Sequence, residues 1–241
     1  MSTQNQISGG VSLSSPSEVY ISLEELEWIV KTAARWGVNV FVTSRGYTRV
    51  IDQRRGAAAE IIAAGGPAEL AVGVDPNDLL GALASSGHRA VPVAVGEDSI
   101  VVDGVRAPAT RVCMPLLTKF DYKFGVVVDK DGFEKIVDVA KAVHGHRGGP
   151  VRVEVNGSDL VVAATDTDGV RAVGAIKHDY NIDYIEYGYY DIDYLNVAAD
   201  MPTERVGITF SKQRVDDVPV LYVTGGYNGT HMMALTVAPT L

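Results

Sequence analysis

The sequence predicts an α+β protein built from two copies of one domain, each with two helices packed on antiparallel sheets. A capped helix, three strands, a second capped helix and a further group of strands occur in the first half and recur in the same order in the second. The first helices begin about 109 residues apart (131 − 22), and the second helices about 116 apart (191 − 75). A repeat of this length indicates a duplicated domain rather than a stack of small modules.

The composition is that of a folded, acidic protein. The chain has 241 residues, 46% of them hydrophobic, enough for one large domain or two of ordinary size. A net charge of −9 argues against wrapping DNA over the whole surface, but it is compatible with a local basic stripe. No apolar run approaches the length of a membrane helix, and we expect neither a signal peptide nor a membrane partner. The single cysteine, Cys113, is expected to be a reduced, buried thiol in an intracellular protein.

The first helix is predicted from a capping box at Ser22–Glu25, in which the serine accepts from a backbone amide and the glutamate reaches back. Residues 1–18, rich in Ser, Gly, Gln and Asn, are expected to be flexible. Gly37 ends the helix. The apolar residues that share its inner face are Leu23, Leu26, Ile29, Val30 and Ala33. Three strands are expected after it, at Val38–Thr43, Tyr47–Asp52 and Ala57–Ala63.

The second helix of the first copy starts at Asp75-Pro76, with the aspartate as N-cap and the proline in the first turn. We expect Gly87 to end it. Further strands are predicted at Ala90–Val95, Ser99–Val102 and about Ala109–Met114.

The second copy repeats this order. Asp129 or Asp131 caps a helix that carries Phe133, Ile136, Val137, Ala140 and Val143. Three strands are expected at Val151–Val155, Leu160–Thr165 and Val170–Ile176, joined by turns at Asn156-Gly157 and Asp168-Gly169. Asp191 caps a short helix with Tyr194, Leu195 and Ala198. The last strands are predicted at Val206–Phe210, Val218–Val223 and Met233–Val237.

Three segments could carry chemistry, but each has a simpler interpretation. His144-x-His146 could bind a metal, although a helix end before two glycines explains it better. The stretch Gly225–Gly229 lacks the features of a phosphate loop and is typical of a hairpin turn. The acidic, tyrosine-rich stretch Asn181–Asp193 could bind a cation, but a solvated loop before a helix cap is preferred. No nucleophile has a catalytic context, so we expect no enzyme, no metal site and no cofactor.

Basic residues recur on the first helix of each copy: Lys31 and Arg35, then Lys135 and Lys141. Helices that present such side chains to phosphates make contacts that depend on salt and not on base sequence. A solvated face balanced by neighbouring Glu and Asp residues is an equally good interpretation of the periodicity. Between the copies, the connector Met114–Tyr122 keeps several apolar residues in what should be a surface segment, which suggests docking, either onto this protein or onto a partner.

These residues resemble the sliding DNA clamps of the archaeal and eukaryotic proliferating cell nuclear antigen (PCNA) family over about residues 19–241. The order and spacing of several short motifs carry the resemblance. They are Gly73-Val74-Asp75, Ser44-Arg45-Gly46 followed by Val50-Ile51-Asp52, Tyr194-Leu195-Asn196, Asp217-Val218-Pro219 and the tail Val237–Leu241.

The resemblance implies a trimeric ring with helices around the hole and sheets outside. It implies a processivity factor that encircles double-stranded DNA without sequence preference and tethers DNA polymerase, the clamp loader and other clamp-binding-motif proteins. Lys31, Arg35, Lys135 and Lys141 would then face the DNA. Gly81, Ala84 and Asp200 stand where such clamps tend to carry basic residues, so the channel should be less positive than usual.

The resemblance also implies two protein interfaces. Edge strands of neighbouring subunits would pair through Val112, Cys113, Arg171, Val173 and Ile176. Partner peptides with a glutamine and an aromatic anchor would dock in a pocket formed by Ile51, Leu116, Leu117, Phe120, Tyr122, Pro219, Ala238 and Pro239.

The implied domains are a first clamp domain at 19–113, an interdomain connector at 114–122 and a second clamp domain at 123–241. The protein would be cytoplasmic and DNA-associated, or nuclear if its source is eukaryotic. The alternative is a diverged clamp-fold scaffold, or a checkpoint-type ring subunit, that binds partners without encircling DNA by itself.

Overall fold

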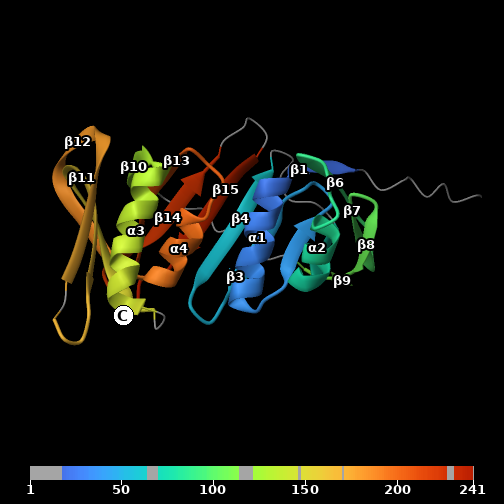
Figure 1. Cartoon of the computed structure of the whole chain (residues 1–241), viewed down its shortest axis with the longest axis horizontal. Coiled ribbons are helices and arrows are strands. Elements are labelled where there is room, and N and C mark those ends of the chain that lie inside the picture. The colour runs from blue at the N-terminus through green and yellow to red at the C-terminus, as the bar shows by residue number, and fades with distance from the viewer. Residues whose placement is uncertain are drawn as a thin grey trace, which may run out of the picture.

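The structure, a computed structural model, describes residues 18–63, 70–113, 122–145, 148–169, 171–226 and 231–240. The molecule is elongated, and the chain order runs along it from the first half (18–113) to the second half (122–240) (Figure 1). The predicted flexible segment, except Glu18, lies outside the described residues. So do the connector residues Leu116, Leu117 and Phe120.

The first half contains two helices and nine strands within the described ranges. They are β1 (Val19–Ser22), α1 (Leu23–Trp36), β2 (Val40–Thr43), β3 (Thr48–Asp52), β4 (Ala57–Ala63), β5 (Ala71–Val74), α2 (Pro76–Leu83), β6 (Ala90–Val95), β7 (Ser99–Val102), β8 (Val105–Pro108) and β9 (Thr110–Arg111).

The described residues of the second half show the same helix order with fewer and longer strands. Its elements are β10 (Tyr122–Asp129), α3 (Lys130–His144), β11 (Pro150–Thr165), β12 (Arg171–Asp191), α4 (Ile192–Ala199), β13 (Arg205–Val215), β14 (Val218–Gly225) and β15 (His231–Val237). The α+β class with antiparallel sheets and two helices in each half is therefore confirmed.

One antiparallel sheet runs through both halves. Its nine strands lie in the order β10-β13-β14-β15-β4-β3-β2-β5-β9, and the halves meet where β15 pairs with β4. A four-stranded sheet, β1-β6-β7-β8, completes the first half, and the two-stranded sheet β11-β12 completes the second. Within the described ranges, buried side chains from the four helices and the three sheets form one connected apolar core.

Local signals place the helix starts well. The side chains of Asp75, Asp129 and Asp191 each accept a hydrogen bond from a backbone amide in the first turn of the helix that follows. Ser22 also occupies an N-cap position, but its side chain makes no capping bond, so the predicted capping box is wrong. Gly37 ends α1 in the left-handed conformation at φ 68°, as predicted.

The N-caps refine the repeat. The first helices are offset by 107 residues (129 − 22) and the second helices by 116 (191 − 75). The second half therefore carries nine more residues between its two helices (116 − 107). This extra length goes into β11 and β12.

The β11–β12 region is where the prediction fails most clearly. Asn156-Gly157 was expected to reverse the chain, but β11 continues through it, and the ladder with β12 shifts register there. Gly157 has φ 58°, a conformation that a bulge also uses. The stretch Asn181–Asp193, expected to be a loop, is strand β12 up to Asp191 and then the start of α4. The result is one long ribbon in place of a short meander (Figure 1).

Other boundaries also differ from the predictions. The sequence did not predict β1, β5, β8 or β10. Helix α2 ends at Leu83, before the expected Gly87. The strand expected at Ala109–Met114 is reduced to Thr110–Arg111 among the described residues. No helix of the described ranges is long and apolar enough to span a bilayer.

The two halves are joined by specific contacts as well as by the shared sheet. Trp28 Nε1 on α1 donates a buried hydrogen bond to the carbonyl of Val197 on α4 (2.9 Å). The Tyr194 hydroxyl on α4 donates to Asp52 at the end of β3 (3.0 Å). The ring of Trp36 meets that of Tyr194 edge-on, with centroids 5.4 Å apart. These buried contacts fix the relative position of the halves.

Candidate nucleic-acid and partner interfaces

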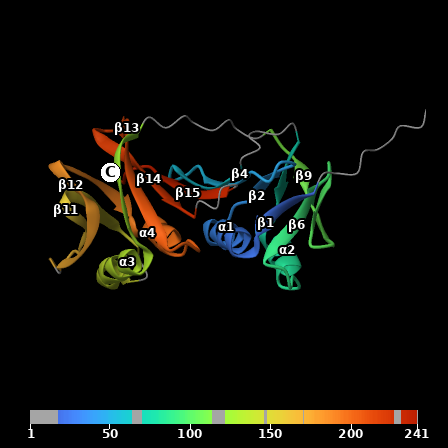
Figure 2. The same ribbon diagram turned by 90° about the horizontal axis from the view of Figure 1, so that it is seen from above.

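The four helices lie side by side along one long face, in the order α2, α1, α4, α3 (Figure 1). Seen from above, the nine-stranded sheet lies behind the helices (Figure 2). α1 contacts α2 and α3 contacts α4 within their halves, and α1 and α4 meet at the junction. The candidate DNA-contacting residues stand on α1 and α3 of this helix face.

On α1, both candidate basic residues are already paired. Lys31 Nζ lies 2.6 Å from the Glu27 carboxylate, one helical turn away. Arg35 lies 3.0 Å from Asp200, just beyond α4. Both pairs are exposed, so each contributes little to stability. A phosphate would nevertheless have to compete with these carboxylates.

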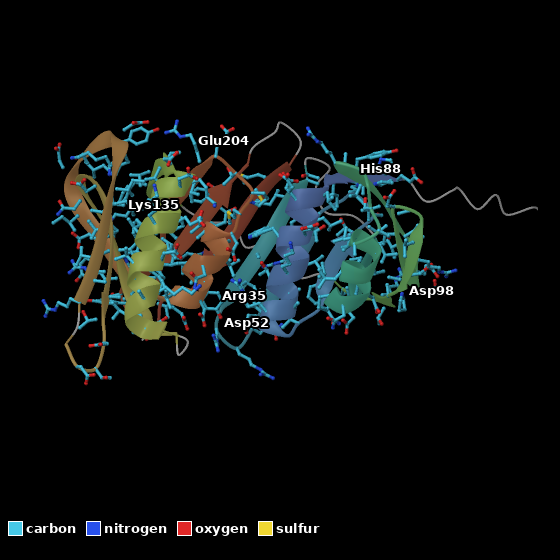
Figure 3. All side chains as sticks on the ribbon, in the orientation of Figure 1. Arg35, Asp52, His88, Asp98, Lys135 and Glu204 are labelled. Atoms are coloured by element: carbon cyan, nitrogen blue, oxygen red, sulfur yellow. The ribbon has the colours of Figure 1, made fainter. Side chains whose placement is uncertain are left out.

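On α3 the situation differs. Lys135 and Lys141 are exposed, and neither forms an ion pair within the described part of the chain. In Figure 3, Lys135 is labelled on the upper part of α3, whereas Arg35 is labelled near the lower end of α1. The 107-residue offset makes Lys135 the counterpart of the buried Trp28, and Asp138 the counterpart of Lys31. The basic positions are therefore not repeated between the copies.

The helix face as a whole is not basic. Within the helix bounds there are five Lys and Arg residues and eight Asp and Glu residues, giving 5 − 8 = −3 with His144 neutral. The basic residues are Lys31, Arg35, Lys130, Lys135 and Lys141. The acidic residues are Glu24, Glu25, Glu27, Asp78, Asp131, Glu134, Asp138 and Asp193. DNA contact on this face would depend on a few lysines and not on an overall positive field.

The structure brings some of the candidate pocket residues together. Ile51, half-buried on β3, lines a cleft of about 950 Å³ together with Phe41, Val112 and Cys113. Ala238 lies next to the neighbouring β3–β4 turn, where its N–H donates to the Gly56 carbonyl (3.1 Å). Ile51 and the tail therefore flank the same turn.

Other candidate pocket residues are less available. Pro219 and Pro239 are buried, and the Pro219 carbonyl accepts a hydrogen bond from the Tyr190 hydroxyl (2.7 Å). Tyr122 was assigned to the connector, but it is the first residue of β10. Its ring is half-exposed and lies 5.5 Å from that of Tyr222.

Sequence reasoning missed a buried polar cluster on the outer face of the shared sheet. The Tyr47 hydroxyl donates to Glu60 Oε1 (2.8 Å), and Arg49 Nε lies 2.8 Å from the same oxygen. Burial raises the pKa of the Glu60 carboxyl, and Arg49 and Tyr47 oppose that effect. The signal was present in the sequence, because a glutamate stands within the apolar run Ala57–Ala63.

The candidate subunit-interface residues also differ in exposure. Val173 on β12 is 64% exposed, and Arg171 is exposed beside it. Ile176 is half-buried and packs toward α3, where it leaves no room for a side chain at Gly132. Val112 is half-buried, and its N–H donates to Ala71 within the same chain (3.0 Å). Cys113 is a free, exposed thiol, so the expectation of a buried one is wrong.

The described residues contain no group of three His, Cys, Asp or Glu side chains that could hold a metal ion. His144 lies at the end of α3, where its Nε2 is 3.1 Å from the Pro150 carbonyl. His146 is outside the described residues. β14 and β15 pair antiparallel across Gly225–Gly229, as a hairpin requires, although residues 227–230 are not described.

No protein-family model matches the chain, and no curated protein matches its sequence. Solved structures do match its fold. A chain of the PCNA2–PCNA3 complex of Sulfolobus tokodaii is 16% identical with a TM-score of 0.66, over 92% of this chain and 99% of that one. The β subunit of DNA polymerase III from Pseudomonas aeruginosa is 16% identical with a TM-score of 0.66, over 95% of this chain and 68% of that one.

A third match is the β sliding clamp of C. crescentus, with 16% identity and a TM-score of 0.65, over 95% of this chain and 66% of that one. The chain thus spans about two thirds of the length of these bacterial clamps. Together the matches show that the chain has the duplicated sliding-clamp fold.

Proposed function

We propose that the protein is a DNA sliding clamp, a ring that encircles duplex DNA and tethers replication and repair enzymes. The observation that supports this most strongly is the arrangement of the duplicated halves. Four helices share one long face, a continuous sheet lies behind them, and a separate sheet stands at each end of the molecule. A subunit of this design suits a ring with helices inside and sheets outside. The role is that of a scaffold and not of an enzyme.

The ring we propose is a trimer of the PCNA type, closed by strand pairing between β12 of one subunit and the β9 edge of the next. An exposed apolar edge strand is a liability unless it is paired. Val173, 64% exposed on β12, would be buried by such pairing. One matching chain comes from a complex of two different PCNA proteins. The proposal therefore includes a ring in which this chain assembles with a different subunit.

The molecular mass in solution tests the assembly. A homotrimer has a mass of 3 × 25.7 = 77.1 kDa. We expect light scattering to give this value for the purified chain at micromolar concentration. A mass of 25.7 kDa for the chain alone, with no partner subunit that raises it, would contradict the ring.

DNA contact in this proposal is made with phosphates only, through lysines and arginines of the helix face. Such contacts carry no base preference and weaken steeply with salt. We assign most of the contact to Lys135 and Lys141, because Lys31 and Arg35 are engaged with carboxylates. The ring would hold DNA by enclosure, with weak attraction.

Partner capture is proposed at Ile51 and the tail, where the cleft and the β3–β4 turn meet. An aromatic anchor in such a pocket commonly carries much of the energy of an interface. Ile51→Asp should abolish binding of a Gln-and-aromatic peptide in calorimetry while the mass and melting temperature stay close to wild type. Val105→Asp, a change at another exposed apolar residue in the same half, serves as the control. Equal loss in both variants would remove the pocket from the proposal.

A second candidate function is a clamp-fold scaffold that binds partners without enclosing DNA. The net charge of −3 summed over the four helices and the ion pairs of Lys31 and Arg35 favour it. The two candidates differ in whether DNA topology matters, because an enclosing ring is retained only on DNA without free ends.

A further inference from the structure

The C-terminal tail links the two halves. Its Ala238 N–H donates to the Gly56 carbonyl in the β3–β4 turn of the first half (3.1 Å). Its Thr240 N–H donates to the Tyr189 carbonyl on β12 of the second half (2.8 Å). Pro239 is buried between these two anchor points. The path of the tail is therefore set by one backbone bond on each side.

Gly56 occupies the tightest point of that path. It has φ +67°, in the left-handed region that favours glycine. A Cβ built on it would lie 2.8 Å from the Cβ of Ala238. Apolar carbons at rest stay about 3.5–4.0 Å apart, so one of the two would have to move by about 1 Å. The Ala238 methyl cannot rotate away, and the tail backbone would have to shift.

We propose that Gly56 is the positioning residue for the tail: the missing side chain lets Ala238 lie against the β3–β4 turn, and this contact sets the tail side of the peptide pocket. The inference rests on the partner site proposed above. Gly56 itself need not touch the peptide. It acts through Ala238, whose displacement would also draw Thr240 away from Tyr189.

Three variants test this position. Gly56→Ala introduces the collision. Gly104→Ala is the matched control, because Gly104 has a similar φ of +80° but no atom within 4 Å of a built Cβ. The double variant Gly56→Ala with Ala238→Gly keeps the strained backbone conformation at residue 56 and removes the opposing methyl. Backbone strain and collision are thereby separated.

Two measurements are made on each variant of the full chain. Amide hydrogen exchange at Ala238 and Thr240 reports the position of the tail directly. Calorimetry with a synthetic Gln-and-aromatic peptide reports capture. We expect Gly56→Ala to speed exchange at both amides and to weaken peptide binding on the order of tenfold. We expect the double variant to recover slow exchange at residues 238 and 240, and this exchange is the readout of rescue because Ala238 itself belongs to the proposed pocket. We expect Gly104→Ala to match wild type in both properties.

Two outcomes would overturn the proposal. One is unchanged exchange and affinity in Gly56→Ala. The other is fast exchange at residues 238 and 240 that Ala238→Gly does not slow again, which would attribute the effect to backbone strain at residue 56. If the wild-type chain binds no peptide, the proposed partner site is wrong, and so is the proposed effect of Gly56 on peptide binding. Hydrogen exchange then decides separately whether Gly56 places the tail.

Discussion

The first helices of the two halves share four buried apolar positions and differ in other positions, some of which only α1 buries. At the 107-residue offset, Leu26, Ile29, Val30 and Ala33 of α1 correspond to Phe133, Ile136, Val137 and Ala140 of α3, all of them buried. The exposed Lys135 corresponds to Trp28, which is buried against α4. The core requirement is the same in both copies. The remaining positions follow from the neighbours of each helix, because α1 lies at the junction and α3 lies outside it.

The strands differ more than the helices. Among the described residues, four short strands, β2 to β5, lie between α1 and α2, whereas the two long strands β11 and β12 lie between α3 and α4. β12 is tied to the main sheet by Glu186, which pairs with Lys123 on β10 and Arg214 on β13. The ribbon gives the second half a long exposed edge, while the edge strand of the first half, β9, has two residues. The second half should therefore dominate assembly.

The largest expected effect comes from interrupting the ribbon edge. Val173→Pro removes a backbone donor from β12, and proline is poorly tolerated in a paired strand. We expect the trimer to dissociate completely to monomers at micromolar concentration, as measured by light scattering. Val173→Thr keeps the β-branched shape and the donor and should remain trimeric. A trimeric Val173→Pro variant would show that β12 is not the assembly edge.

The next effect concerns DNA. DNA affinity falls with salt along a line whose slope relates the logarithm of the binding constant to the logarithm of the salt concentration. Changing Lys135 and Lys141 to alanine should make this slope shallower by roughly 1.8, about 0.9 for each phosphate that is no longer neutralised. The pair Lys31→Ala and Arg35→Ala should have a smaller effect, because carboxylates already neutralise these groups. Fluorescence anisotropy over a salt series with random-sequence duplex measures both. Equal slopes in the two double variants would contradict the assignment to α3.

A third prediction compares Trp28 with Lys135. Trp28→Phe leaves the Val197 carbonyl without its buried donor and should cost about 2 kcal/mol. For a chain of this size that corresponds to a fall in Tm of roughly 4–8 °C. Lys135→Ala, at the equivalent exposed position, should change stability by no more than about 0.5 kcal/mol. Calorimetric melting curves with similar Tm values for the two variants would contradict the junction role of α1.

The smallest effect concerns Glu25, which corresponds to Gly132 in the second half. The Glu25 side chain is 6% exposed, and its Oε2 has no hydrogen-bond partner in the described part of the chain. Burial first, and the charge of Glu24 second, raise the pKa of Glu25 above its ordinary value of 4.5. A raised folded-state pKa adds stability below the unfolded pKa, and this stability is lost as pH rises through the folded value.

Glu25→Gln should therefore be more stable than wild type at about pH 8 and should lose that advantage near pH 4.5. Urea unfolding of both proteins at the two pH values measures the difference. A difference in unfolding free energy between the two proteins that stays constant with pH would show that ionisation of the Glu25 carboxyl does not cause it.

Signals that act within one turn of the chain could be predicted from the sequence. The caps Asp75, Asp129 and Asp191 are such signals, because an N-cap and its amides are neighbours in sequence. β10 was missed because Gly125 interrupts its pattern. A distant strand requires this glycine, because a side chain at position 125 would collide with Thr209 on β13. Sequence periodicity cannot report such a contact.

In the candidate sites, too, local features could be predicted from the sequence and contacts with distant residues could not. The basic residues on α1 and α3 were recognised from their spacing, but the partner of Arg35 is Asp200, 165 residues away. The exposure of Cys113 and the burial of Pro219 and Pro239 depend equally on tertiary packing. Asn156-Gly157 shows that even a strong turn signal can become a bulge when a long partner strand continues past it.

Retention on DNA of different topology tests the central claim most directly. The assembled protein is placed on a nicked circular plasmid, washed in moderate salt, and compared with the same plasmid cut once by a restriction enzyme. A sliding clamp should remain on the circle and be lost from the linear form through its free ends. Equal retention on both forms, or none on either, would contradict enclosure of DNA and favour the scaffold that binds partners alone.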